Sequence, residues 1–271
     1  MCIRDSLYSE SNEFKNKLIF TIKDSDGLVV KKVFKSPKKG VQRFQWDLRY
    51  EQKVPVSFAK SSFYNPFAGV SEGTLIKPGM YSIEMDLFDG SDFTKLVNPV
   101  SFNVKALKIT SMPATDRDNK VVFQRNVSQL EGEMLSAAQM LGDASNKIKY
   151  FKEAIKLVEA PYDELSKLIF NTDSKIKSIN TSLYGNSLKS KLDIVETPTA
   201  YSRLMSILYE QKYSTSSPTF THLESFEIAK EEFTPIFNQI KNLLKVDIKE
   251  IENKLKILNA PYTPGRLKAK Y

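Results

Sequence analysis

The chain has 271 residues and a formal net charge of +8, and 41% of its residues are hydrophobic and 11% aromatic. This composition allows a buried core and excludes a wholly disordered chain, and the length suits one large domain or two ordinary ones. No apolar run reaches the roughly 18 residues that a membrane-spanning helix needs. Basic residues are spread over both halves of the sequence, which favours a solvated basic surface over a nucleic-acid-binding stripe.

The first six residues, Met-Cys-Ile-Arg-Asp-Ser, match neither of the patterns that follow them. They resemble the translation of a tag used to build sequencing libraries. We therefore expect residues 1–13 to be a tag and a disordered lead-in, and the natural N-terminus, with any signal peptide, to be missing. The single cysteine, Cys2, lies in this segment, so disulfides, thiolate zinc sites and cysteine nucleophiles are excluded for the rest of the chain.

Apolar and polar residues alternate in short stretches over the first part of the chain, and turns rich in Gly, Pro and Asp separate these stretches. The predicted strands centre on residues 18–22, 29–34, 44–48, 81–87 and 100–104. Trp46 falls on the apolar side of the third strand, so we expect it in the core. Short strands between turns predict an antiparallel β-sandwich of the immunoglobulin or fibronectin type III kind over residues 14–108.

One long segment, from about residue 51 to 75, breaks the alternation and is expected to be a loop or insertion. Its aromatic residues are Phe58, Phe63, Tyr64 and Phe67. They could bind a partner or pack back on the sandwich. Packing is the favoured use, because large aromatic side chains are rarely left exposed together.

After about residue 110 the apolar residues recur in alternate steps of four and three, which predicts helices that each bury one narrow stripe. The longest stripe covers residues 123–158. A second covers residues 165–183 and ends at Gly185, an expected C-cap. A shorter helix is expected over residues 198–213.

The last long helix is expected to begin with Ser217 as N-cap and Pro218 in the first helical position. Its apolar stripe is carried by Ile236, Ile240, Leu244, Ile248 and Ile251. The four helices predict an antiparallel bundle over residues 116–262, followed by a tail at 263–271. The predicted fold class is therefore α+β in two domains, a sandwich followed by a bundle.

The only histidine, His222, is the first candidate for chemistry. A metal site built on it would need carboxylate ligands, and only Glu224 and Glu227 lie close in sequence. A Ser-His-Asp triad would have to use the same residue, which lies in a predicted helical segment. We therefore expect His222 to be a surface residue in the first turn of a helix.

Two pairs of carboxylates, Asp24 with Asp26 and Asp86 with Asp89, could in principle perform glycosidic chemistry. All four residues fall at or beside predicted turns, where aspartate is favoured because its side chain bonds to the local backbone. The sequence therefore predicts no catalytic, cofactor-binding or metal-binding residues.

Three stretches resemble a known module: residues 22–32, residues 40–49 with Phe-Gln-Trp-Asp-Leu-Arg, and residues 78–83, which begin Pro-Gly-Met-Tyr. They are similar to the Ig-like or fibronectin-type modules of secreted bacterial proteins, including the module of flagellar hook-capping proteins. Lys31 and Lys32 stand where arginine is common in that pattern.

The order of Ig-like module and helical bundle, over roughly residues 15–265, resembles the C-terminal region of bacterial sortilin-like proteins. These are often labelled glycosyl hydrolases because their N-terminal β-propeller carries neuraminidase-type repeats. Residues 246–253 match the closing-helix motif of that family, D-L-x-x-x-N, only loosely. No propeller repeat lies in this chain, so no propeller residue can be transferred to it.

The resemblance implies a non-catalytic C-terminal accessory fragment of a larger secreted, periplasmic or outer-surface bacterial protein. It would act as a spacer, docking or interaction module for an upstream β-propeller, with a protein or glycan as a further partner, and without nucleic acid, cofactor or membrane span. Two alternatives stay open. One is part of a glycosyl-hydrolase-like enzyme with a carboxylate site between sandwich and bundle. The other is a binder of anionic polymers, which a continuous basic face would favour.

Overall fold

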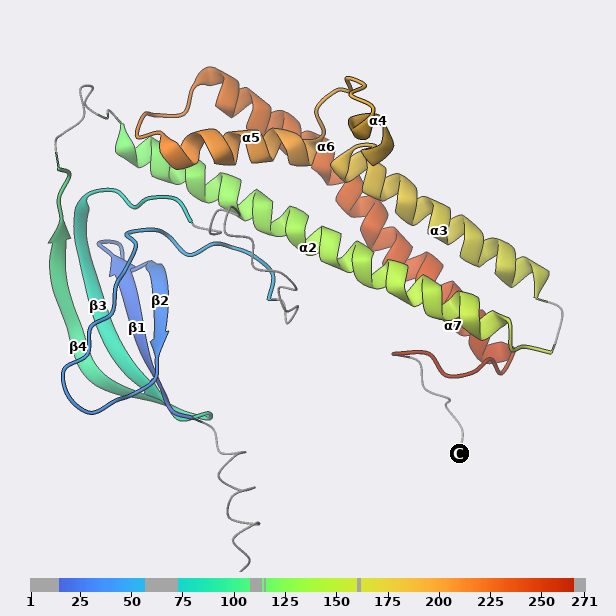
Figure 1. Ribbon diagram of the computed structural model, residues 1–271, viewed down its shortest axis with the longest axis horizontal. Helices are drawn as coiled ribbons and strands as arrows, with labels where there is room; N and C mark the ends of the chain where they lie inside the picture. Colours follow the sequence, from blue (N-terminus) through green and yellow to red (C-terminus); the bar gives the residue numbers. More distant parts are fainter. Residues whose placement is uncertain (1–14, 57–72, 108–113, 115, 160–161, 266–271) are drawn as a thin grey trace, which may run out of the picture. The chain divides into compact units, whose positions relative to one another are not determined.

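The computed structural model describes residues 15–56, 73–107, 114, 116–159 and 162–265. The chain divides into two compact units, one containing the strands and the other most of the helical residues, and each is described by itself (Figure 1). The expected tag and lead-in, and the four aromatic residues of the predicted loop, lie outside the described residues. The structure is mixed α+β with an antiparallel sheet, as the sequence predicts from alternating residues in its first part and helical spacing in its second.

The four antiparallel strands form a single sheet in the order β2-β1-β3-β4 (Figure 1). The strands are β1 Lys17–Asp24, β2 Val29–Lys35, β3 Gly79–Phe88 and β4 Phe93–Val104. Each coincides with one of the alternating stretches, because side chains on successive residues of a strand point to opposite faces. These four strand predictions are therefore confirmed.

The strand predicted at residues 44–48 is wrong, since this described segment has no strand. Leu48 has a φ of 56°, in the left-handed region, and this turns the backbone out of the extended conformation. The segment pairs only through an isolated bridge between Arg49 and Leu75. The apolar residues of the segment alternate because their side chains pack against the sheet, although the segment is not one of its strands.

Trp46 lies on the core side of this connection, as its place in the alternation predicts. Its ring meets Tyr81 and Phe102 edge to face, with centroids 5.9 and 6.2 Å away. Its Nε1–H donates a hydrogen bond to the carbonyl oxygen of Arg49, at 3.1 Å. The side chain therefore joins the connection to one apolar face of the sheet.

The edge strand β4 is irregular where its sequence reads Asn98-Pro99. The register slips twice, on both sides of the pair formed by Met85 and Val97, and Asn98 and Pro99 lie opposite the single residue Glu84. These are β-bulges, and proline is found in sheets at such bulges and on edge strands. The bulges break the alternation, which explains why the sequence indicates only the second half of β4.

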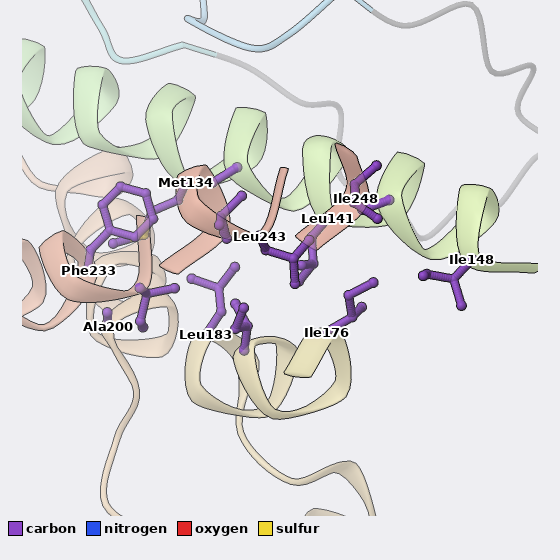
Figure 2. Packing of buried hydrophobic residues seen from close by; sticks show 14 of the residues in the cluster. Met134, Leu141, Ile148, Ile176, Leu183, Ala200, Phe233, Leu243 and Ile248 are labelled. Atoms are coloured by element: carbon purple, nitrogen blue, oxygen red, sulfur yellow. The ribbon is translucent and has the colours of Figure 1, made fainter. Parts of the chain in front are cut away.

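The helical unit contains six α-helices and a π turn in the described residues. The elements are α2 Arg117–Ile155, α3 Asp163–Tyr184, α4 Ser187–Lys191, α5 Ala200–Tyr213, α6 Phe220–Asn242, η1 Leu243–Asp247 and α7 Ile248–Ile257. All of these elements except α4 contribute to one core, in which Met134, Leu183 and Leu243 come from different elements (Figure 2). Of these described helices, none has the length and apolar character needed to cross a membrane.

The helix ends confirm one cap prediction and correct another. Gly185, with a φ of 88°, ends α3, and its N–H donates to the carbonyl of Thr181 at 2.8 Å. The N-cap of α6 is Thr219, not Ser217, because the Oγ1 of Thr219 accepts from the backbone N–H of His222. Pro218 thus precedes the cap instead of following it, and α6 begins two residues later than the sequence indicates.

The stripe of the last long helix differs from the predicted one at a single position. Leu243 is buried, whereas Leu244 is only half-buried. The next buried residue is Ile248, so the stripe contains one step of five residues. The π turn η1, which accommodates more residues per turn than an α-helix, absorbs this step and returns α7 to the core.

Candidate functional site

His222 occupies the third position of α6 and has hydrogen-bonding neighbours on both ring nitrogens. Nδ1 accepts from the backbone N–H of Thr219 at 3.1 Å and lies 3.1 Å from Nε2 of Gln211. Nε2 lies 2.6 Å from the Oε2 atom of Glu210, on α5. Because Nδ1 accepts from a backbone N–H, the proton of the neutral ring is on Nε2 and points to the Glu210 carboxylate.

This geometry is a capping box and not half of a catalytic triad. Thr219 accepts from the backbone of His222, and His222 accepts from the backbone of Thr219, so each satisfies an N–H that the first helical turn leaves free. In a triad, the ring nitrogen opposite the carboxylate must be open to a nucleophile's proton. Here that nitrogen, Nδ1, is already engaged by Thr219 and Gln211.

Two of the aspartates singled out in the sequence, Asp24 and Asp89, accept hydrogen bonds from the backbone of their own turns. Oδ1 of Asp24 accepts from the backbone N–H groups of Asp26 and Leu28, at 3.1 and 2.9 Å, in the turn between β1 and β2. In the β3–β4 turn, Oδ1 of Asp89 accepts from the backbone of Asp92 at 2.9 Å and of Ser91 at 3.0 Å. These backbone donors hold the pKa of Asp89 below its usual range.

Asp86 does not join Asp89 in that turn. It lies within β3 and pairs in register with Lys95 of β4. On the same sheet, Glu84 forms ion pairs with Lys23 of β1 and, at 3.7 Å, with Lys95. The bond from Lys23 is the main cause of a lowered pKa at Glu84. This three-strand charge ladder was not predicted, although each residue occupies a polar position of its strand's alternation.

A pocket of about 300 Å³ lies beside the π turn, between α3, α6 and η1. It is lined by Lys175, Ser178, Ile179, Gln239, Asn242, Leu243 and Asp247. Nζ of Lys175 and Oδ2 of Asp247 are 2.9 Å apart and form an ion pair, so the lining has no net formal charge. The volume is at the lower end of the range for small-molecule sites, which begins at about 300 Å³.

The pocket depends on the π turn, because η1 supplies both Leu243 and Asp247 to its wall. Single π turns occur frequently at functional sites. In the sequence, the π turn is indicated by apolar residues five positions apart, Leu243 and Ile248, which are both buried in the structure. The sequence analysis missed it by assigning Leu244 to the stripe.

A second pocket, also of about 300 Å³, contains two carboxylates, Glu196 and Glu232. Each already has a cationic partner: Lys189 lies 2.7 Å from Glu196, and Arg203 lies 3.5 Å from Glu232. The bond from Lys189 lowers the pKa of Glu196. A general acid in glycoside hydrolysis needs a raised pKa, so Glu196 is poorly suited to that role.

Among the described side chains, no group of three or more His, Cys, Asp or Glu residues is placed to hold a metal ion. Comparisons of this chain with protein-family models, with curated proteins and with solved structures find no match. The resemblance to sortilin-like proteins therefore stays a hypothesis based on the sequence motifs.

Proposed function

We propose that this chain is a non-catalytic accessory region of a larger secreted or periplasmic bacterial protein. In this proposal an Ig-like module and a helical bundle form two domains that space or dock an upstream β-propeller. A protein or glycan is the further partner, and nucleic acid is not. The proposal rests on the sequence motifs together with the geometry of the polar side chains.

The observation that carries the non-catalytic part is the engagement of Nδ1 of His222. A backbone N–H from Thr219 and the side chain of Gln211 occupy the nitrogen that would otherwise act as a base. Asp24 and Asp89 are likewise bound to the backbone of their turns. Three of the candidates for chemistry named from the sequence, His222, Asp24 and Asp89, thus have structural roles.

The Ig-like part is supported by the antiparallel order β2-β1-β3-β4 and by the position of Trp46. A tryptophan packed on the inner face is typical of Ig-type sandwiches. The connection that carries Trp46 covers the face on which an Ig sandwich places its second sheet. The isolated bridge between Arg49 and Leu75 supports this part of the proposal, because it lies outside the four-stranded sheet.

A turnover screen tests the non-catalytic proposal. The purified chain would be incubated with sialosides, aryl glycosides and general esterase substrates, and we expect no hydrolysis above a buffer blank. Turnover that copurifies with the chain and disappears in Glu232→Gln or Glu196→Gln would contradict the proposal and favour the carboxylate-enzyme alternative. The same result in His222→Gln would contradict the capping role.

The accessory role is tested at the level of the gene. We expect the genomic reading frame to continue upstream of residue 7 and to encode a propeller. Limited proteolysis of the extended protein should then release the propeller less readily when residues 15–265 are present than when they are deleted. A frame that begins at this chain, or one that encodes another fold, would contradict the accessory proposal.

A further inference from the structure

The pocket beside the π turn has two walls, and each wall is one side of a helix. Residues at positions i, i+3 and i+4 lie on the same side of a helix, and both walls use this spacing. The wall residues are Lys175, Ser178 and Ile179 on α3, and Gln239, Asn242 and Leu243 on α6 and the start of η1. Two aligned rows of side chains therefore line one cavity of about 300 Å³.

Three polar side chains of this lining are available to a ligand. Ser178, Gln239 and Asn242 have no side-chain hydrogen bond or ion pair among the residues that the structure describes. Other hydroxyl groups of α3 differ, since Thr181 and Ser182 donate to backbone carbonyls four residues earlier, at 3.0 and 3.2 Å. One hydroxyl and two carboxamides of the lining thus keep both their donors and their acceptors.

The charged residues of the lining are already bound to each other. Nζ of Lys175 lies 3.1 and 2.9 Å from the two carboxylate oxygens of Asp247. A zwitterionic ligand would have to separate these charges in order to bind them. A hydroxyl group would not, because each carboxylate oxygen has a further lone pair and the ammonium group has further protons.

Two apolar side chains complete the lining. Ile179 and Leu243 are 5% and 2% exposed and belong to the core of the helical unit. An apolar ligand would contact them, but it would also remove the nearby hydroxyl and carboxamides from water without offering them hydrogen bonds, which is unfavourable. A ligand with a net charge would lose hydration without finding an uncompensated opposite charge. The lining therefore suits a neutral ligand with many hydrogen-bonding groups.

A sugar has this chemistry. Its ring carries C–H groups on its faces and hydroxyl groups around its rim, and each hydroxyl both donates and accepts. We propose that this pocket binds a neutral sugar unit, with Gln239 and Asn242 bonded to its hydroxyls and a C–H face on Ile179 and Leu243. The inference rests on the proposed function and deepens it, because it gives the glycan partner a site. Binding occurs without hydrolysis, since glycoside hydrolysis uses two carboxyl groups and this lining contains one, that of Asp247.

Ligand-observed NMR with the complete chain tests the proposal. The probes are the methyl glycosides of glucose, galactose, mannose and N-acetylglucosamine, together with free alanine as a zwitterion and citrate as an anion. We expect saturation transfer from the protein to at least one sugar, with a Kd of about 1 mM because a single sugar unit makes few contacts, and none to alanine or citrate. Transfer to none of the sugars, or equal transfer to alanine or citrate, would overturn the proposal.

Gln239→Ala and Asn238→Ala form a matched pair that locates the site. Both residues are exposed amides on α6, but only Gln239 belongs to the lining. Gln239→Ala should weaken sugar binding about fivefold, which corresponds to the loss of about one hydrogen bond, and Asn238→Ala should leave binding unchanged. Equal effects of the two changes would place the sugar elsewhere and contradict the proposed site.

Ser178→Phe and Asn180→Phe test the cavity itself. Both positions are exposed on α3, and they lie about 200° apart around the helix axis. Ser178→Phe should fill the pocket and remove sugar binding, whereas Asn180→Phe, outside the lining, should keep it. A Ser178→Phe variant that folds, as judged by circular dichroism, and still binds would overturn the proposal; if it does not fold, Gln239→Ala decides.

The sugar site and the accessory role can fail separately. Loss of the sugar proposal would leave the turnover screen blank and the upstream propeller in place. Conversely, a reading frame without a propeller would remove the accessory role and leave sugar binding at this pocket to be measured with the same variants.

Discussion

Leu243 and Ile248 lie in the same core although they are five positions apart, and each is only 2% exposed (Figure 2). In a regular α-helix of 3.6 residues per turn, five positions correspond to a rotation of about 500°, which would place the two side chains on different faces. The π turn between them removes the mismatch. The helix thus accommodates one residue more than a regular α-helical stripe would contain by forming one irregular turn, and both α6 and α7 still pack against the core.

Deleting Lys245 should convert the π turn into regular α-helix. The step between the two buried positions becomes four residues, so the stripe stays in phase and the protein should keep its helical content and a melting temperature within a few degrees of the original. Circular dichroism during heating measures both quantities. The deletion should also reshape the pocket at Asp247, since η1 forms its wall.

Deleting Glu231 is the matched control for this prediction. Glu231 is exposed within the regular part of α6, so its loss rotates every following side chain by about 100° relative to the core. We expect a large loss of cooperativity on heating. Equal behaviour of the two deletions would contradict the explanation of the π turn.

His222→Ala should lower the free energy of unfolding by about 1 kcal/mol, because the first turn of α6 loses its reciprocal cap. His222→Gln should retain most of the stability, since glutamine is favoured at this position of a capping box. Urea unfolding followed by circular dichroism measures the difference. A His222→Gln variant as unstable as His222→Ala would show that the bond to Glu210, and not the cap, supplies the stabilisation.

Trp46→Ala should cost about 3 kcal/mol of stability in the sheet unit, at the lower end of the range for large aromatic residues because the side chain is only partly buried. Trp46→Phe keeps an aromatic ring against Tyr81 and loses the N–H donated to Arg49, so it should cost about 1 kcal/mol. Chemical denaturation can measure both. A small effect of Trp46→Ala would mean that the connection contributes little to the core.

The stability of the helical unit should fall in acid because of Asp173. Burial pushes the pKa of this carboxyl upward, but the bonds from Lys152 and Lys177 outweigh that effect and hold the pKa below its usual value. A carboxyl with a lowered pKa stabilises the fold above its unfolded pKa, and this contribution is lost as the pH falls through the folded value, from about pH 5 downward.

Asp173→Asn should therefore lower the free energy of unfolding near neutral pH by about 1 kcal/mol. The free energy of unfolding of this variant should also fall less steeply as the pH is lowered. Asp143→Asn, an exposed position of α2 with no ion pair among the described residues, is the control and should leave the acid profile unchanged. Urea midpoints between pH 7 and pH 3 measure the effect. An unchanged profile in Asp173→Asn would assign the acid sensitivity to other carboxyls.

The sequence predicts those parts of the fold whose side chains repeat at a fixed interval. The apolar stripe of α2 and the alternation in β1 and β3 are visible in the sequence, because the buried face of each element requires apolar residues. The pattern fails at Leu48, where a left-handed backbone interrupts an apolar alternation, and at Asn98-Pro99, where bulges break one. Local backbone geometry of this kind has no periodic signature.

The candidate sites were harder to predict than the fold. The turn roles of Asp24 and Asp89 follow from residue type and local sequence, because their partners lie within four residues. The partners of His222 on α5, Glu210 and Gln211, depend on how two helices pack, which one sequence does not specify.

The bulged edge of β4 has a consequence for how this molecule can associate. A regular edge strand offers an unbroken ladder of N–H and C=O groups to which a strand of another molecule can add. Pro99 lacks an N–H, and the two register slips put the remaining groups out of step. The bulges and Pro99 therefore disfavour the addition of a second chain to the bulged part of β4, and they disfavour fibre formation through it.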